Sequence, residues 1–577
     1  MNKFFLLFLI FSLSGLFRIV AQTPYNNNPR DPFFAPKPQQ EQASKVQHIH
    51  SDESGVKPDQ YEGNLVFSGN VKFEHQGSVL TADKVVLYQK ENFLKAIGNV
   101  VLLNADGTKI TAEEMEYDGN SQRGIARRNV VLTDPKQSIK TEILYYDRVP
   151  NTAYFNTGGT ISDGQNIMYT KSATYYVNTK DIDFVGHSTI DAKDYTIESD
   201  NIKTNQTTKL SKFFGPTTIR SKTNYGNYVY TELGEHDGKT GISHLRKNSR
   251  IHYNGKILTG DELVYNRNTG FGKGTGNVML DDPKEKRFVK GGYAEIYELK
   301  DSAMITNKPY AVKIFEKDSM YISADRFLSF QKPDSTNQKK SYLRAYHKVR
   351  VFKTNMQARA DSMSYNETDG ILHLMKNPIL WSGTKQITGD EVKVFMNTTT
   401  QDIDSVKVLG NAFAISKVDS LNMKDEFHQI KSKWMGIYFE KGQIKKAVAV
   451  ENAQSIAYAD EENEKTKEMS RIGVAIAVCG QIEADFIEKR LETVTCRIGA
   501  QSDIYPMSML PREKRFFPDF NWNTKDRPKK WEDIFLDTPN YDEIVYESDN
   551  KLYDLAEAER QKQAEKNKPK TPVREKR

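Results

Sequence analysis

Apolar and polar residues recur along this chain with a period of about thirty residues. Each copy places a small or short polar residue before an acid inside an apolar frame, as in Leu80-Thr81-Ala82-Asp83-Lys84-Val85. Self-similarity at a fixed period is typical of repeat architectures, in which each unit buries its apolar face against its neighbours. The small residue falls at Ala82, Ala112, Thr141, Lys171, Ser199, Thr231, Gly260, Gly291, Ala324, Ala360 and Gly389, with the copies at Lys171 and Thr231 resting mainly on spacing.

Apolar residues alternate with polar ones on either side of the small residue, but the alternation slips by one position across it. In the first copy Leu80 lies two positions before Ala82, whereas Val85 and Leu87 lie three and five positions after it. A strand keeps one face inward with a period of two, so this slip predicts a bend or bulge between two strand halves. The pattern therefore predicts an almost wholly β chain whose strands each turn a corner.

Two columns of residues mark this predicted corner. Glycine and asparagine tolerate a positive φ angle, so the pairs Gly98-Asn99 and Gly276-Asn277, about sixteen residues after the small residue, predict turns or bulges. We expect the acids beside the small residues to accept hydrogen bonds from turned backbone N–H groups. Because the acid repeats in register, it indicates a structural rule rather than a catalytic pair or a calcium repeat. The column comprises Asp83, Glu113, Glu142, Asp261, Asp325, Asp361 and Asp390.

Composition and charge exclude several other classes of protein. With 37% hydrophobic and 11% aromatic residues, the 577-residue chain is too apolar to be disordered. The net charge of +6 comes from the two ends, because residues 1–21 contribute +2 and residues 551–577 contribute +4. Residues 22–550 hold 71 charges of each sign, so the body carries no extended cationic footprint and we expect no nucleic-acid partner.

The ends of the chain lack the repeat. Residues 1–21 combine Lys3, an apolar run and Ile19-Val20-Ala21, which predicts a cleavable signal peptide and export. Residues 22–58 are polar and without period, which predicts a flexible linker. We expect repeats over 59–300 and 301–460, a β-rich cap over 461–530, and a charged tail over 531–577 that is partly helical or disordered.

The sequence offers little catalytic chemistry. We find no P-loop, no Cys-x-x-Cys, no His-Glu-x-x-His and no Ser-His-Asp context, so we expect neither an enzyme nor a cofactor or metal. Cys479 and Cys496 lie seventeen positions apart and could form a disulfide outside the cytoplasm, but their spacing leaves this open.

Three segments carry a resemblance to a known family. Phe67-Ser68-Gly69-Asn70-Val71, the copy at Leu80–Val85 and Ala96-Ile97-Gly98-Asn99-Val100 resemble the OstA-like family, which includes the LptA-like periplasmic bridge of lipopolysaccharide transport. The resemblance covers roughly residues 60–440, and the run from Ile504 to Pro528 is similar to the end of long members. It implies an elongated antiparallel β-jellyroll, a trough open along one side, without catalytic residues to transfer.

An open trough of this kind predicts a lipid site. Acyl chains can replace missing side chains between the walls and gain about 25 cal/mol for each Å2 of apolar surface buried. The resemblance implies lipopolysaccharide or a related glycolipid as the cargo, carried toward the outer membrane along a continuous track. The candidate groove residues are Leu80, Val85, Leu87, Ile110, Met115, Tyr117, Leu258, Leu263, Tyr265, Ile387 and Val392.

Other interpretations of the same pattern stay open. The inner face could be a closed core, and the chain could be a cell-surface structural or adhesive β-solenoid without lipid cargo. A β-helix enzyme acting on glycans would need a localised acid cluster or metal site, which the sequence lacks. If the resemblance holds, we expect a periplasmic protein that joins other lipopolysaccharide-transport proteins by edge-strand pairing, and association with the outer-membrane translocon is left open.

Overall fold

The computed structural model describes residues 44–316, 318–400, 402–418, 426–440, 443–462, 469–487 and 490–535. The predicted signal peptide, most of the predicted linker and the tail beyond residue 535 lie outside these residues. The chain divides into two compact units, Met1–Gly164 with Thr174–Asn178 and Gln165–Ala173 with Thr179–Arg577. The sequence indicated no division there, because the repeat itself continues through this segment.

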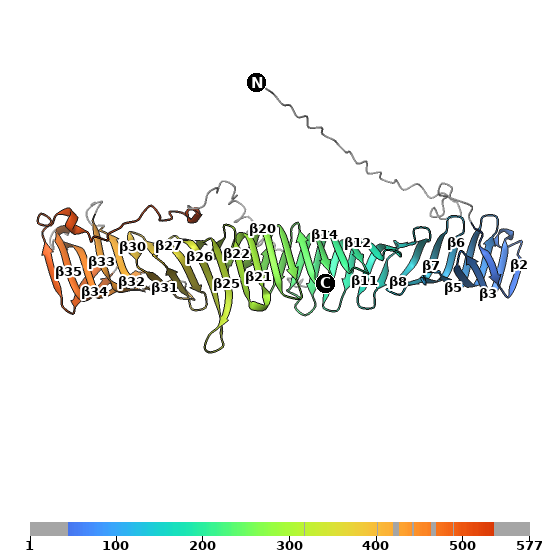
Figure 1. Ribbon diagram of the computed structural model, residues 1–577, viewed down its shortest axis with the longest axis horizontal. Coiled ribbons are helices and arrows are strands. Elements are labelled where there is room, and N and C mark those ends of the chain that lie inside the picture. The colour runs from blue at the N-terminus through green and yellow to red at the C-terminus, as the bar shows by residue number, and fades with distance from the viewer. Residues whose placement is uncertain are drawn as a thin grey trace, which may run out of the picture. The chain divides into compact units, whose positions relative to one another are not determined.

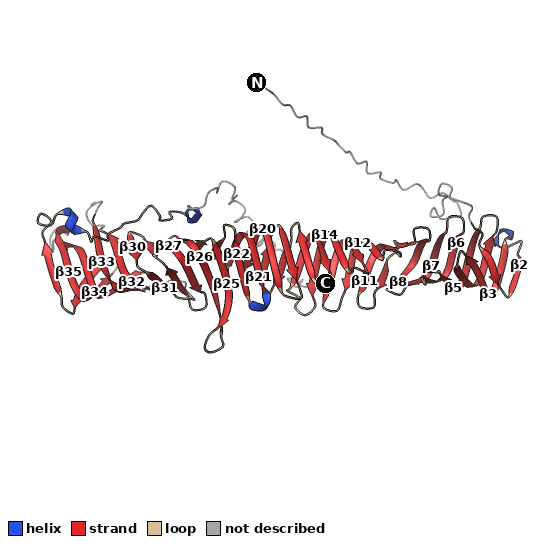
Figure 2. Cartoon of the chain, viewed as in Figure 1, coloured by secondary structure: helices blue, strands red, loops and turns tan. Residues whose placement is uncertain are grey.

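Within the described residues the protein consists of antiparallel strands and a few short 3-10 helices (Figure 2). The first unit contains β1(Gln47–His50), β2(Glu53–Val56), η2(Tyr61–Gly63), β3(Leu65–His75), β4(Ser78–Tyr88), β5(Phe93–Leu103), β6(Lys109–Asp118), β7(Arg123–Thr133), β8(Ser138–Asp147), β9(Thr152–Phe155) and β10(Gly159–Ser162). The division between the units falls in β11(Ile167–Tyr176). The second unit continues with β12(Asp181–Asp191), β13(Tyr195–Asn205), β14(Leu210–Ser221), β15(Tyr228–Asp237), β16(Ile242–Arg246), β17(Arg250–Tyr253), β18(Lys256–Thr259), β19(Glu262–Asn266), β20(Phe271–Asp282), β21(Arg287–Tyr297), η3(Glu298–Lys300), β22(Ser302–Thr306), β23(Tyr310–Ile314), β24(Ser319–Ser323), β25(Arg326–Pro333), β26(Lys339–Lys353), β27(Met356–Asn366), β28(Ile371–Met375), β29(Ile379–Ser382), β30(Lys385–Thr388), β31(Glu391–Met396), β32(Ile403–Lys417), β33(Phe427–Glu440), β34(Gln443–Glu462), β35(Met469–Ile487), β36(Arg490–Arg497), β37(Gln501–Tyr505), η4(Arg512–Arg515) and η5(Trp531–Phe535).

The flexible linker predicted over residues 22–58 is wrong for its last part. Strands β1 and β2 both pair with β3, with Gln47 opposite Glu74 and Glu53 opposite Ser68. All eight residues of these two short strands are exposed. Because backbone hydrogen bonds hold them without an apolar face, they leave no hydrophobic period in the sequence.

In the second unit the strand halves form two walls (Figure 1). Wall A contains β16, β19, β22, β25, β28 and β31, and wall B contains β17, β18, β23, β24, β29 and β30. Longer strands cross from one wall to the other. For example, β20 pairs with β19 through Phe271–Thr275 and with β18 through Met279–Asp281. This confirms the predicted all-β trough in which strands turn a corner.

The corner is a bulge at the predicted glycine–asparagine column. In β5, Gly98 and Asn99 have φ angles of 77° and 45°, and the pairing of β5 with β6 shifts register between Ile97 and Val100. The apolar residues keep the predicted phase, with Leu80 4% and Val85 0% exposed. The weak copy at Lys171 is displaced by one residue, because Lys171 is exposed and the buried corner hydroxyl belongs to Thr170, 2.8 Å from the Ser188 hydroxyl.

The acids beside the small residues accept hydrogen bonds at these corners, but from side chains and not from the predicted backbone N–H groups. The Asn99 side-chain amide donates to the Asp83 carboxylate at 2.9 Å, and Asn277 donates in the same way to Asp261 at 3.0 Å. Asn248 and Glu232 repeat the contact at 2.9 Å, which gives the weak copy at Thr231 the same corner. The donor is therefore an asparagine side chain, because the left-handed backbone turns that side chain toward the acid on the neighbouring strand.

We expect Gly276→Ala to destabilise the protein by about 2–3 kcal/mol, measured by urea denaturation. Gly276 has a φ of +67°, and an added Cβ would overlap the Asp261 carboxylate. The matched control is Gly255→Ala, where φ is +79° but nothing lies within 4 Å of the added Cβ. That variant isolates the backbone penalty of about 1–2 kcal/mol. Equal losses in the two variants would contradict a carboxylate seated over the glycine.

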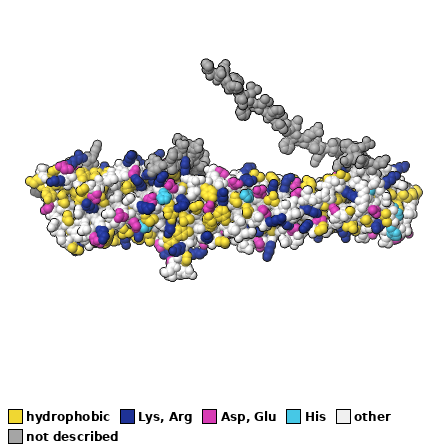
Figure 3. Space-filling model, viewed as in Figure 1, with side chains coloured by type: hydrophobic (Ala, Val, Ile, Leu, Met, Phe, Trp, Pro, Cys, Tyr) yellow, Lys and Arg dark blue, Asp and Glu magenta, His cyan; other side chains and the backbone are white. Residues whose placement is uncertain are grey.

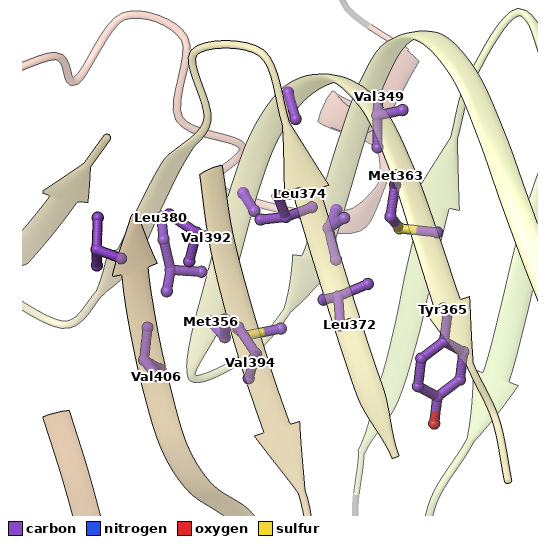
Figure 4. Packing of buried hydrophobic residues seen from close by; sticks show 14 of the residues in the cluster. Val349, Met356, Met363, Tyr365, Leu372, Leu374, Leu380, Val392, Val394 and Val406 are labelled. Atoms are coloured by element: carbon purple, nitrogen blue, oxygen red, sulfur yellow. The ribbon is translucent and has the colours of Figure 1, made fainter. Parts of the chain in front are cut away.

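The interior of the second unit is tightly packed from β27 to β32. Met363, Leu372, Leu374 and Val392 from successive strands meet there, and each is 1% exposed or less (Figure 4). The disulfide that the sequence left open is present, linking Cys479 of β35 to Cys496 of β36 across a Cα–Cα distance of 6.0 Å. It joins neighbouring strands at the C-terminal part of this unit.

Residues 506–535 form a C-terminal strap on the outer face of wall B. The strap runs back from β37 across β33, β30 and β27 to β24 (Figure 1). Gln386 points away from the core that its neighbour Ile387 joins, and both ends of its amide bind strap backbone at Asn521 and Asn523. Gln429 binds Arg515 and Phe517 in the same two-pronged way.

The strap corrects two predicted boundaries. The predicted cap over 461–530 is β only as far as Tyr505, and Trp531–Phe535 do not belong to the charged tail. Ile534 and Phe535 are 2% and 4% exposed because they pack on Tyr310 and Val312 of β23. Apolar residues at irregular spacing in a non-periodic segment produce no strand signal, so the sequence pattern could not place this segment on a sheet.

Candidate functional site

A cavity of about 610 Å3 lies between walls A and B of the second unit. Its lining residues fall between Asp194 and Ser341, on strands from β13 to β26. The cavity reaches Thr223, Asn227 and Asp301, which lie in the turns at the ends of the strands, so it opens at the rim of the two walls. It is therefore a groove with an apolar floor near the corner and a polar mouth.

One row of residues on the wall B side of the cavity is aliphatic. Inward-facing residues of successive strands stand side by side, because β14 pairs with β15 and β17 pairs with β18 in register. They offer a continuous surface without hydrogen-bonding side chains, and its residues are Ile197, Ile219, Val229, Ile251, Leu258 and Leu280. Such a surface favours alkyl chains over water.

The wall A side carries polar groups that are already paired. His236 Nδ1 lies 2.9 Å from the Ser243 hydroxyl, and the Tyr265 hydroxyl donates to Glu298 at 2.7 Å. Burial raises the pKa of Tyr265, and the nearby Glu298 carboxylate adds to the rise. Burial lowers the pKa of His236, so this imidazole is neutral near pH 7. The cavity is thus amphipathic, because hydroxyl and imidazole groups line it together with alkyl groups from both walls.

His252 also lines the cavity. Its ring stacks on Tyr228 with centroids 4.0 Å apart, and among the described residues its Nε2 has no hydrogen-bond partner. Burial, with Arg250 and Arg220 nearby, lowers the pKa of His252 to about 4. The His252 imidazole is therefore neutral near pH 7.

The structure brings two of the eleven predicted groove residues to this cavity. They are Leu258 and Tyr265, and Leu263 lies in the small core directly beside them. In the core from β27 to β32, Val392 is fully buried and Ile387 packs against it. For all eleven residues, contact with lipid stays a prediction.

In the first unit the predicted groove residues line a packed interior. Leu80 and Tyr117 border a cavity of only about 20 Å3, and Leu87 is half-buried. Burial raises the pKa of Tyr117 to about 12, and its hydroxyl lies 2.8 Å from His75 Nδ1. The remaining predicted residues of this unit are buried, namely Val85, Ile110 and Met115.

Sequence reasoning missed most of the lining. Val229 and Ile197 occupy the predicted apolar position two residues before Thr231 and Ser199, but the copy at Thr231 was too weak to nominate. The polar pair of His236 and Ser243 has no apolar signal at all. The alternating pair Gly272 and Gly274 was the available sign that one wall lacks side chains here.

The fold places this chain among the antiparallel β-jellyroll or trough proteins. Residues 43–200 match a family model described as OstA-like protein, and residues 312–400 match one described as LptA/(LptD N-terminal domain) LPS transport protein. Both matches support an OstA-like member of the lipopolysaccharide-transport family and a role in lipopolysaccharide transport in general. No curated protein matches the chain. Most of the cavity lies between the two matched segments.

Two further observations concern the described residues alone. None of the helices found there is long and apolar enough to cross a membrane. No group of three or more His, Cys, Asp or Glu side chains in that part of the chain could hold a metal ion. Charged side chains of both signs are interspersed over the face in Figure 3.

Proposed function

We propose that this protein is an exported periplasmic carrier that holds lipopolysaccharide in the amphipathic cavity on its way to the outer membrane. The membership of the lipopolysaccharide-transport family supports the cargo class, and the apolar wall B surface supports the binding mode. Acyl chains lie against wall B, and sugar and phosphate groups face the polar rim. The role requires positioning and release of the lipid without any covalent step.

The energetics favour alkyl groups on wall B. Each methylene moved from water to an apolar surface contributes about 0.8 kcal/mol. Ile219, Ile251 and Leu280 present such a surface without a polar group to desolvate. Wall A supplies Ser243, His236 and Tyr265, which can exchange partners with a glycolipid as it binds.

The proposal includes partners at the strand edges. Among the described residues, β36 and β37 each pair with β35, and β1 and β2 each pair with β3. Edge strands with unpaired backbone groups can accept a strand from another protein. We propose that other lipopolysaccharide-transport proteins join there, and that the signal peptide delivers the chain to the periplasm.

A photo-crosslinking residue tests the cargo. Placed at Leu280, which lines the cavity, it should form an adduct with lipopolysaccharide in the intact cell envelope. The matched control is Met279, the preceding residue in β20, whose side chain points to the opposite face and is similarly half-buried. Equal labelling of both positions would indicate a sticky surface, and labelling of neither would favour a structural solenoid without lipid cargo.

A further inference from the structure

Two segments about one hundred residues apart present the same rows of wall A with very different side chains. Along one row, pairing places Tyr265, Gly272, Ile296 and Ala303 side by side across four strands. The matching row is formed by Tyr365, Leu372, Val394 and Val406. The first row faces the cavity, whereas the second row is 7% exposed or less throughout.

The row nearer the corner is packed in both segments, although its residues are smaller in the first. Gly274 and Ala294 are neighbours in the first segment, and Leu374 and Val392 are their counterparts in the second. Val278 and Leu263 fill the space beside Gly274, whereas the space beside Gly272 stays open, because Gly272 and Ala303 stand where the second segment has Leu372 and Val406. The cavity therefore lies where wall A lacks side-chain volume at Gly272 of β20.

The filled segment obstructs lengthwise movement. Protein interiors are close-packed, so an acyl chain could enter the interior of β27–β32 only by displacing side chains such as Leu372 and Leu374. The same chain can reach the cavity without such displacement, because the cavity meets the turns that carry Thr223, Asn227 and Asp301.

We propose that lipid occupies one chamber, between residues 194 and 341, and enters and leaves it across the rim of the two walls. The interior of β27–β32 is closed to lipid, so the cargo does not slide through it. This inference rests on the proposed function and specifies how that site is loaded. It replaces the continuous track with a single holding site on the second unit, and it makes Gly272 the residue that keeps the chamber open.

Gly272→Leu tests the chamber directly. An added Cβ makes ordinary contacts there, 3.6 Å from Ile296 Cβ and 3.8 Å from Tyr265 Cδ2, so the larger side chain extends into the cavity. We expect binding of purified short-chain lipopolysaccharide to weaken at least tenfold. Lys273→Leu adds the same side chain on the opposite face and should change binding less than twofold. Unchanged binding in Gly272→Leu would overturn the proposal.

Two measurements on the unmodified full-length protein complete the test. Native mass spectrometry should count one lipopolysaccharide per chain, and bound lipid should slow hydrogen exchange in β14–β25 while leaving β27–β32 unchanged. A second equivalent lipid, or protection of β27–β32, would overturn the single chamber while upholding the carrier function. A protein that binds no lipopolysaccharide at all would instead overturn the proposed function itself. Because this map needs no variant, it decides the matter even if Gly272→Leu folds poorly.

Discussion

Gln386→Ala is expected to release the C-terminal strap locally and to destabilise the protein by about 3 kcal/mol. Gln386 is 1% exposed, and its amide donates to the Asn521 carbonyl at 2.6 Å and accepts from the Asn523 N–H at 2.8 Å. Alanine would leave both backbone groups without these partners inside a covered layer. An unsatisfied buried polar group costs about 1–3 kcal/mol, and two are created here.

Hydrogen exchange read by mass spectrometry, together with urea denaturation, measures this effect. Exchange should accelerate in residues 516–527, because contacts in a repeat array are local and the loss stays near Gln386. The control is Gln338→Ala, which changes the same side chain at an exposed turn and should alter stability by less than about 0.5 kcal/mol. Unchanged exchange in the strap would show that its aromatic contacts alone hold it.

Those aromatic contacts are a separate source of strap stability. Phe516, Phe517 and Phe520 pack near Phe413 and Phe427, on the outer face of wall B. Trp381 adds a hydrogen bond from its Nε1 to the Asn523 carbonyl at 2.9 Å. The strap thus shields the outer face of wall B from solvent. This explains how large aromatic residues lie buried on that side.

The period of the sequence was sufficient to predict the corner. Three sequence features indicate the bulge at the corner, which each repeat needs for its own backbone. They are the slip in apolar phase around Ala82, the acid at Asp83 and the pair Gly98-Asn99. Local demands of this kind recur in every copy, so they are visible in a single sequence. The contact between Asp83 and the Asn99 side chain escaped prediction because it joins neighbouring strands, and the period fixes spacing without fixing side-chain direction.

The cavity and the strap could not be predicted in the same way. Both are departures from the repeat, since Gly272 stands where the packed segment has Leu372, and residues 506–535 follow no period at all. Such a departure from the repeat can be recognised only when the strand register is known, because the register shows which residues of two repeats occupy equivalent positions. Of the nominated groove residues, Leu258 and Tyr265 reach the cavity because they lie in the copy that also contains the glycines.

Acidification from pH 7 to pH 4 is expected to destabilise the second unit, with His252 contributing about 1–2 kcal/mol after allowance for its partial exposure. Burial holds the pKa of His252 at about 4, against an ordinary value of 6.5. Between pH 6.5 and about 4, His252 is therefore protonated in the unfolded chain but neutral in the folded protein. Unfolding takes up a proton in this range, so it becomes more favourable as the pH falls to about 4. Burial lowers the pKa of His236 and of His428 as well, so they act in the same direction.

The pH dependence of the urea midpoint measures this loss, and hydrogen exchange in β15–β18 locates it. His252→Phe keeps a ring that can stack on Tyr228 but cannot bind a proton, so the loss between pH 7 and pH 4 should shrink by about 1–2 kcal/mol. His187→Phe, at an exposed position in β12, should leave the pH dependence as it is in the unmodified protein. If His252→Phe retains the full loss, the acid sensitivity belongs to other groups. A loss that grows as pH rises would contradict the depressed pKa of His252, because a depressed histidine pKa removes stability only on the acid side.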